Sequence, residues 1–299
     1  MKFLRRNEES KRSINSNTFL LFITIGLFAA MYIAGMIIFE DKGFAKPQMF
    51  LNLFISNAGL LVIAVGQTIV MITGGIDISV GSVTALVCMA VANQMEHHGM
   101  NAYMAVLLAL FIGVAYGVVQ GFLISYLEIQ PFIVSLAGLF FGRGLTSMIS
   151  TEMISIKNKT FLAWANYKIY LPIGSYSRRG KFLPAYIYPT VIIALLIVII
   201  VAVIMKYTKF GREVYAVGGN AQSAMMMGLN VRKTKFKAYL LNGLLAGCGG
   251  FLFCLNSCSG FVEQAKGLEM DAISASVIGG TLLSGGVGTP FGTIFGVLI

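Results

Sequence analysis

Charged residues are scarce in this chain, and their scarcity sets its class. Only 11% of the 299 residues are charged, while 57% are hydrophobic and the mean hydropathy is +0.81. Soluble domains carry about 25% charged residues. The composition therefore excludes a soluble domain and predicts an all-α, polytopic integral membrane protein.

Catalytic signatures are missing as well. The sequence contains no G-x-x-x-x-G-K-[ST] loop to hold ATP phosphates, and no G-x-S-x-G or H-E-x-x-H motif. The two histidines, His97 and His98, are adjacent, so a helix could not direct both at one site. Cys254 and Cys258 lie one helical turn apart, but without a nearby histidine we interpret them as packing residues. We expect no catalytic residue, no metal site and no cofactor.

Basic residues outnumber acidic ones and give a net charge of +10. Much of the excess lies in residues 1–18 and in the loop 206–237. No soluble basic domain is present to bind a duplex, so we expect no nucleic-acid partner. Since basic loops stay in the cytoplasm, we predict a cytoplasmic tail at 1–18, a single transmembrane domain at 19–299, and loop 206–237 inside. Counting spans places the polar loop 151–185 outside.

Apolar runs long enough to cross a bilayer recur along the chain, and we count about eight to nine of them. The runs 182–205 and 238–262 enclose the basic loop. The run 272–299 has no charge and reaches the end of the sequence, so we expect one or two more spans beyond it and about ten in full. Glycines at four-residue spacing predict close helix contacts. They are Gly113, Gly117 and Gly121 in one span, and Gly243 and Gly247 in another.

The loop 206–237 has a structured centre. Gly218-Gly219-Asn220 predicts a turn, Asn220 can cap a helix, and Ala221 to Met227 are good helix formers that stop at Gly228. Such a short helix is unstable alone in water, and its three methionines would offer an adaptable apolar surface. A basic loop lying on anionic lipid is the alternative. We favour a docking element for a cytoplasmic partner, with the contact residues Gly218, Gly219, Asn220, Ala221, Ala224, Met227 and Gly228.

A single acid interrupts the apolar segments of the first third of the chain. Asp77 lies in the sequence GGIDISVGS at 74–82 and is the only acid between Asp41 and Glu96. A carboxylate at membrane depth is costly, which makes it a candidate functional residue. Two roles stay open, namely capping of the next helix beside Ser79 and direct contact with a ligand. Part of the motif, G-G-x-x-x-S-x-G, recurs at 279–286, and paired interrupted segments indicate a binding site where two halves meet.

Three motifs occur in order and together carry a family resemblance. They are GGIDISVGS at 74–82, VGGN-A-x-x-A-x-x-x-G at 217–228 and VIGGTLLSGGVGTPFG at 277–292. In combination they resemble the ribose/xylose-type permease subunits of bacterial ABC sugar importers. Within that family the chain is most similar to a galactofuranose importer permease. The resemblance runs through nearly the whole chain and implies an inner-membrane, multi-pass permease for a monosaccharide.

The resemblance also implies partners. Cytoplasmic ATPase subunits would grip loop 206–237, a second permease subunit would complete the path in the lipid bilayer, and an external binding protein would deliver the sugar. Basic residues of the external loop would meet acidic groups on that binding protein, namely Arg178, Arg179 and Lys181. We expect the path itself to be lined by polar residues in spans or at their breaks, namely Asn57, Gln67, Asp77, Ser79, Thr281 and Ser284.

Two functions from other classes remain as alternatives. The chain could be a secondary transporter in which Asp77 exchanges a proton or sodium ion with the substrate, or a membrane scaffold without transport. Arg143, an isolated charge within a span, either pairs with a carbonyl group or contacts the path.

Overall fold

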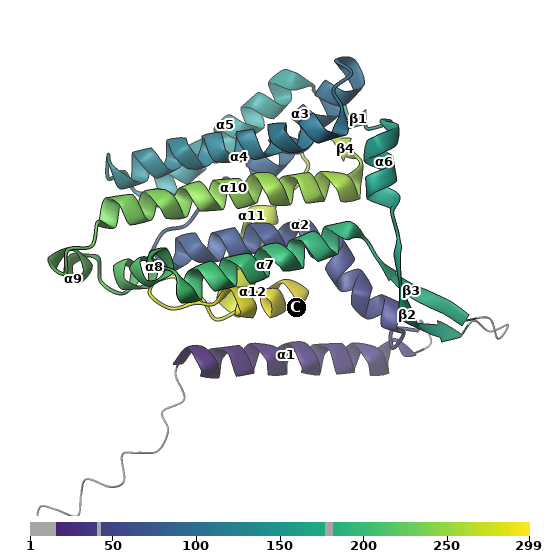
Figure 1. The fold of residues 1–299 in the computed structure, drawn as a ribbon, viewed down its shortest axis with the longest axis horizontal. Coiled ribbons are helices and arrows are strands. Elements are labelled where there is room, and N and C mark those ends of the chain that lie inside the picture. Colours follow the sequence, from purple (N-terminus) through teal and green to yellow (C-terminus); the bar gives the residue numbers. More distant parts are fainter. Residues whose placement is uncertain (1–15, 41–42, 177–181) are drawn as a thin grey trace, which may run out of the picture.

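The long helices of this protein lie side by side in one bundle (Figure 1). A computed structural model describes residues 16–40, 43–176 and 182–299. Within these residues, six helices are long and apolar enough to cross a bilayer. They are α1 (Ser16–Ile38), α2 (Pro47–Ile72), α4 (Ala102–Ser125), α5 (Pro131–Ile149), α7 (Pro189–Tyr207) and α10 (Val231–Ser257).

Three further helices belong to the bundle but are too short or not apolar enough to count as membrane spans. They are α3 (Val80–His97), α11 (Leu268–Ile278) and α12 (Pro290–Leu298). Although α3 has 18 residues, it is less apolar, and α11 and α12 have only 11 and 9 residues. The count of eight to nine spans is therefore not confirmed by the described residues.

Glycines interrupt the uncharged run 272–299 within the repeated motif 279–286. The residues Gly280, Gly285 and Gly286 have φ angles of +92°, +88° and +76°. A right-handed helix cannot contain such angles, and glycine adopts them at little cost. The chain therefore forms a loop between α11 and α12 instead of one long helix.

The core of the bundle is centred on α2. Every residue from 61 to 72 is buried, as expected for a helix that is surrounded by other helices. The neighbouring α10 packs against both α2 and α4 (Figure 1). At the contact between α4 and α10, a Cβ on Gly113 would collide with Gly243 O, and one on Gly117 would lie 2.8 Å from Tyr239 O. The predicted glycine stripes thus face each other and let two backbones touch.

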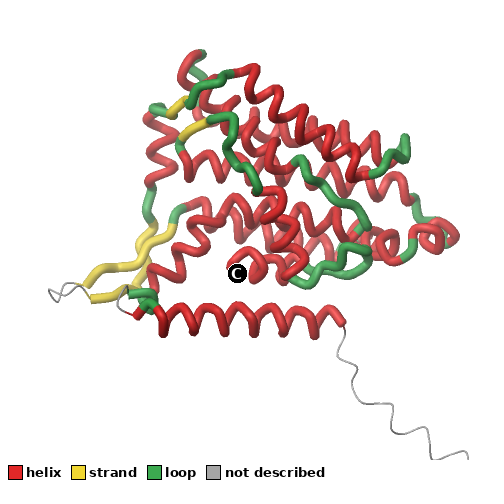
Figure 2. The backbone as a smooth tube through the Cα atoms, turned by 180° about the vertical axis from the view of Figure 1, so that it is seen from behind, coloured by secondary structure: helices red, strands yellow, loops and turns green. Residues whose placement is uncertain are grey.

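The strands lie at one end of the bundle (Figure 2). In antiparallel pairs, β1 (Ile154–Ser155) joins β4 (Ser259–Gly260) and β2 (Ile169–Tyr176) joins β3 (Phe182–Ile187). Helix α6 (Lys159–Asn166) follows β1 in the chain.

The all-α prediction holds for the bundle but is wrong for the loop 151–185. The residues of β3, which we expected to begin a span, are aromatic and aliphatic side chains that also favour strands. Helix α7 begins only at Pro189, a residue suited to the first helical turn.

The opposite end of the bundle carries α8 (Lys209–Gly219) and α9 (Ala221–Met226) (Figure 1). Helix α1 begins at this same end. Loop 206–237 and the described part of loop 151–185 therefore lie at opposite ends of the bundle. Which of the two loops lies in the cytoplasm stays a prediction.

Candidate functional site

Asp77 lies in the short segment between α2 and α3, at the centre of a buried polar network. Its Oδ1 accepts hydrogen bonds from Ser79 N at 2.9 Å and from Ser79 Oγ at 2.6 Å. Its Oδ2 accepts one from Asn242 Nδ2, on α10, at 2.7 Å. Asp77 is only 4% exposed, and no Lys or Arg that the structure describes pairs with it. The carboxylate is thus held by neutral donors, which a buried charge without an ion pair requires.

The network extends to α4 and back to α2. Gln120 Nε2, on α4, donates to Ser79 Oγ at 2.7 Å. The Gln67 side chain faces the backbone of Asp77. In the amide orientation that pairs donors with acceptors, its nitrogen donates to Asp77 O at 3.0 Å and its oxygen accepts from Asp77 N at 3.2 Å. Below, the Asp77 network means Gln67, Asp77, Ser79, Gln120 and Asn242.

Three of these five residues were candidates from the sequence, and two were missed. Gln120 and Asn242 are uncharged polar residues in apolar spans, the same signal that identified Gln67. That signal could therefore have found them.

The other three predicted pathway residues lie outside this network. Thr281 is buried and Ser284 is exposed in the loop between α11 and α12, while Asn57 is half-buried on α2 and bonds to its own helix. The loop nevertheless touches the end of α2, because Gly286 N donates to Ile72 O at 2.9 Å. The two copies of the glycine motif also meet, because a Cβ on Gly285 in the second copy would lie 3.0 Å from Gly74 N in the first. That a ligand binds between them stays a prediction.

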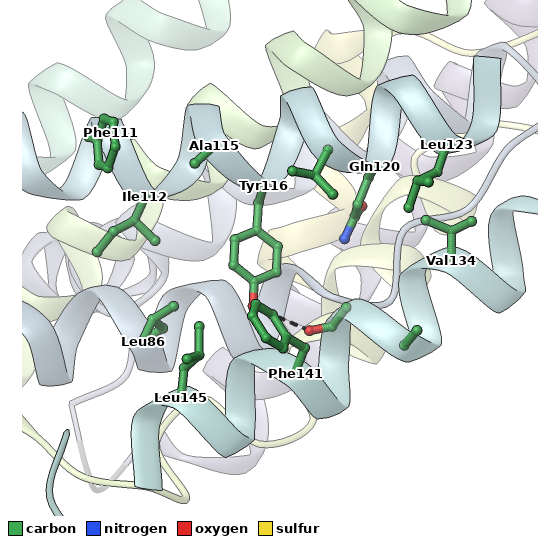
Figure 3. A pocket seen from close by; sticks show the side chains of 13 residues that line it. Leu86, Phe111, Ile112, Ala115, Tyr116, Gln120, Leu123, Val134, Phe141 and Leu145 are labelled. Carbon is green, nitrogen blue, oxygen red and sulfur yellow. Dashed lines mark hydrogen bonds between the residues drawn. The ribbon is translucent and has the colours of Figure 1, made fainter. Parts of the chain in front are cut away.

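A pocket of about 640 Å³ opens between α4 and α5 (Figure 3). Its walls are mainly apolar and include Phe111 of α4 and Phe141 of α5. The polar side chains that reach it are engaged elsewhere: Tyr116 OH donates to Gly138 O at 3.4 Å, and Gln120 belongs to the Asp77 network. Sugar hydroxyls need polar partners, so this pocket suits hydrocarbon better than a sugar.

The predicted docking helix is present as α9. Asn220 Oδ1 accepts a hydrogen bond from Ser223 N at 2.8 Å, which caps the helix. The helix ends at Met226, and Gly228 follows with a φ of +80°, the left-handed stop that glycine provides. The local chemistry of the sequence was sufficient to predict this element.

The predicted turn at Gly218-Gly219-Asn220 is wrong for the two glycines. Both belong to the last turn of α8, and only Asn220 leaves helical geometry. Close packing explains the first glycine, because a Cβ on Gly218 would overlap Ile72 O. Gly219, by contrast, has no atom near the position of a Cβ.

The two faces of α9 differ in exposure. Ala224 is fully buried against the permease itself, whereas Met225, Met226 and Met227 are 63%, 78% and 69% exposed. The free surface therefore combines these methionines with the exposed polar residues Gln222 and Ser223, and Ala224 packs the helix against the rest of the permease. Ala221 is half-buried beside it.

Of two further charged sites, one lies within the described residues. Arg143 Nη1 donates to Val262 O at 2.8 Å and to Gln264 O at 2.7 Å, so it pairs with carbonyl groups, the first of the two expected roles. The predicted docking residues Arg178, Arg179 and Lys181 lie outside the described residues. They fall between β2 and β3, whose exposed tyrosines include Tyr170 and Tyr176.

Comparison with known proteins gives extensive matches. Residues 49–299 match the family described as branched-chain amino acid transport system / permease component. The inner membrane ABC transporter permease protein YjfF of Escherichia coli is 40% identical over 281 residues, which cover 93% of this chain and 81% of that protein. The fructose import permease protein FruG of Bifidobacterium longum is 33% identical, over 91% of this chain and 78% of its own length. The ribose import permease protein RbsC of Escherichia coli is also 33% identical, over 91% and 82%. No solved structure matches the chain.

The matches extend over nearly the whole chain, including the Asp77 segment and α9. These relatives are transporter permeases and not enzymes. Together with six candidate spans, they identify a multi-pass protein of the inner membrane. The chain belongs to the branched-chain amino acid transport system / permease component family and is a permease subunit of an ABC transporter.

Proposed function

We propose that this chain forms half of the translocation path of an ATP-driven importer for a monosaccharide. The observation that carries the proposal is a capped helix, α9, exposed at one end of a bundle whose relatives are named as import permeases. The family description names branched-chain amino acids, but the relatives described above include permeases for fructose and ribose. Their names favour a sugar.

The mechanism is alternating access driven from the cytoplasmic face. Cytoplasmic ATPase subunits bind the exposed methionines Met225, Met226 and Met227 and close together when ATP binds. A second permease subunit completes the path. An external binding protein delivers the sugar, with Arg178, Arg179 and Lys181 as its docking residues. The ion-coupled alternative is not favoured, because the relatives are ABC transporter permeases.

The six polar candidates divide into two groups. Asn57 and Ser284 are partly or fully accessible, and we propose that they contact the sugar. The buried residues are Gln67, Asp77, Ser79 and Thr281. They are 0–4% exposed and support the wall of the path. For Asp77, burial and three hydrogen bonds support a structural role over substrate contact.

We propose galactofuranose as the sugar. The support is the resemblance of the three motifs to a galactofuranose importer permease. Selection between sugars rests mainly with the binding protein, since a path must hold its substrate weakly enough to release it.

Reconstitution tests the proposal. The permease subunits, the ATPase subunits and the binding protein are assembled in liposomes, and uptake of labelled galactofuranose, ribose, fructose and leucine is measured with ATP. The control replaces the phosphate-binding lysine of the ATPase. We expect saturable uptake of galactofuranose that the control abolishes. Uptake of leucine alone, or uptake that follows an ion gradient without the ATPase, would contradict the proposal.

A further inference from the structure

Three glycine-containing segments meet at the base of α9. They are the end of α2, the end of α8 and the loop between α11 and α12. A Cβ on Gly218 would overlap Ile72 O and lie 2.7 Å from Gly286 N. A Cβ on Gly285 would lie 2.9 Å from Gly218 O and 3.0 Å from Gly74 N. We call Gly74, Gly218, Gly285 and Gly286 the glycine junction.

Hydrogen bonds hold the junction together. Gly286 N donates to Ile72 O at 2.9 Å, which ties the loop to α2. Tyr215 OH, on α8, donates to Gly288 O at 2.8 Å, which ties the same loop to α8. Burial raises the pKa of the Tyr215 phenol above its usual value, so the hydroxyl keeps the proton that it donates.

The junction is stiff because backbones touch without intervening side chains. A side chain at a contact can change rotamer and absorb a displacement, but close-packed backbones cannot. A shift of α8 by a fraction of an ångström must therefore move the end of α2 or the loop beside it.

One side of the junction leads to α9. Helix α8 ends at Gly219 and α9 begins at Ala221, so Asn220 alone separates them. Asn220 also caps α9 through Ser223 N. With a connection this short, movement of α9 is passed to Gly218.

The other side leads into the bundle. Gly74 lies three residues before Asp77 in the same segment. Through Asp77 and Ser79 the segment is bonded to Asn242 on α10 and to Gln120 on α4. A displacement at Gly74 therefore reaches α2, α4 and α10 by way of the Asp77 network.

We propose that the glycine junction transmits movement of α9 to the Asp77 network, with Gly218 and Tyr215 as positioning residues for transport. This inference rests on the proposed function. It goes beyond docking, because it assigns residues that carry the movement after an ATPase has bound.

Adjacent glycines provide a matched test. Gly218→Ala and Gly219→Ala each add one methyl group to the last turn of α8, but only the first would collide with another segment. Both glycines lie in α8, and we propose that docking uses the exposed methionines at α9 instead, so neither substitution should remove the ATPase. In the assembled complex we expect Gly219→Ala to behave as wild type. Gly218→Ala should retain ATPase binding and ATP hydrolysis, while uptake per assembled complex falls about tenfold or more. Equal uptake per complex for the two variants would overturn the inference.

A second variant decides the matter if Gly218→Ala does not assemble. Tyr215→Phe removes the bond to Gly288 O with little change of shape. We expect normal assembly and about threefold lower uptake per complex, as for the loss of one hydrogen bond. Uptake per complex equal to wild type would overturn the inference.

Hydrogen exchange adds a readout that needs no sugar and that a purely structural role would not change. ATP added to the wild-type complex should alter amide exchange in residues 73–79, and Gly218→Ala should abolish that response. A wild type that shows the response but imports no sugar would contradict the proposed function while supporting the junction. An ATP response that is the same in wild type and in Gly218→Ala would overturn the junction.

Discussion

Three hydrogen bonds, from Ser79 N, Ser79 Oγ and Asn242 Nδ2, converge on the buried carboxylate of Asp77. Replacing it by Asn keeps the size of the side chain but turns one acceptor into a donor. The new NH2 group would face either the donors of Ser79 or Nδ2 of Asn242. Asn242 can accept from it only by turning its amide, which takes Nδ2 away from the acceptor that it has in the wild type. An unsatisfied buried group costs about 1–3 kcal/mol, so we expect Asp77→Asn to lower the free energy of unfolding by about that amount. Thermal unfolding of the purified permease in detergent measures the change.

A second charge removal serves as the control for Asp77→Asn. Glu152→Gln removes a carboxylate from an exposed position, where the effect on stability should stay within about 0.5 kcal/mol. Transport by Asp77→Asn should fall modestly and in step with yield. A variant with wild-type stability and yield would contradict the structural role, and the loss of pH-dependent transport alone would favour ion coupling.

The partners of Asp77 mark the limit of sequence reasoning at this scale. A carboxylate in an apolar run is visible directly, and so are amides such as Gln67. Which amide meets the carboxylate is not visible, because Asn242 is 165 residues from Asp77 and Gln120 is 41 residues from Ser79. Such pairs exist only after helices pack, and no local pattern encodes them.

At the scale of elements, α9 presents a surface that can be tested without disturbing the fold. Met225→Asp with Met226→Asp places two charges on side chains that are exposed in the permease. Because burying an unpaired charge against a partner is strongly unfavourable, we expect the ATPase subunits to be lost from the complex. Membrane insertion and thermal stability should stay at wild-type values. Copurification of the ATPase measures the effect.

The control for the methionine variant of α9 removes basic charges from the neighbouring part of the loop. Neutralising Lys233, Lys235 and Lys237 should weaken attachment to anionic vesicles and leave ATPase copurification intact. If α9 were only part of a lipid-facing loop, the methionine variant would retain the ATPase. Ala224→Asp is less informative, because Ala224 is buried within the permease and its replacement would disturb the packing of α9 itself.

Elements differed in how far their sequences determined them. The cap at Asn220 and the stop at Gly228 depend on neighbours in the chain, so both were predicted. Gly218 was interpreted as part of a turn. A glycine is needed there because the backbone of Ile72, on another helix, leaves no room for a side chain, and the local sequence does not show that contact. The residues of β3 were assigned to a span because a short apolar run fits either a helix or a strand.

For the whole molecule, hydropathy identifies lipid-facing helices more readily than it identifies helices that are surrounded by protein. Only 6% of the apolar window of α1 is buried, and the helix contains no charged residue. Helix α3 is almost entirely buried by its neighbours, so it can carry serine, threonine and asparagine without exposing them to hydrocarbon. Span counting from composition is therefore least certain for the centre of the bundle, where α3, α11 and the Asp77 network lie.

The orientation of the bundle gives the last prediction. In a cysteine-free background, Tyr176→Cys and Gln222→Cys place single thiols at exposed positions on opposite ends. We expect a membrane-impermeant maleimide to label position 176 in intact cells and position 222 only after permeabilisation. The reason is mainly span counting, which places loop 206–237 inside, and the basic residues of that loop agree with it. Each variant is the control for the other, since the same reagent and the same cells must give opposite results. Labelling of 222 before 176 would invert the orientation and remove α9 from the reach of a cytoplasmic ATPase.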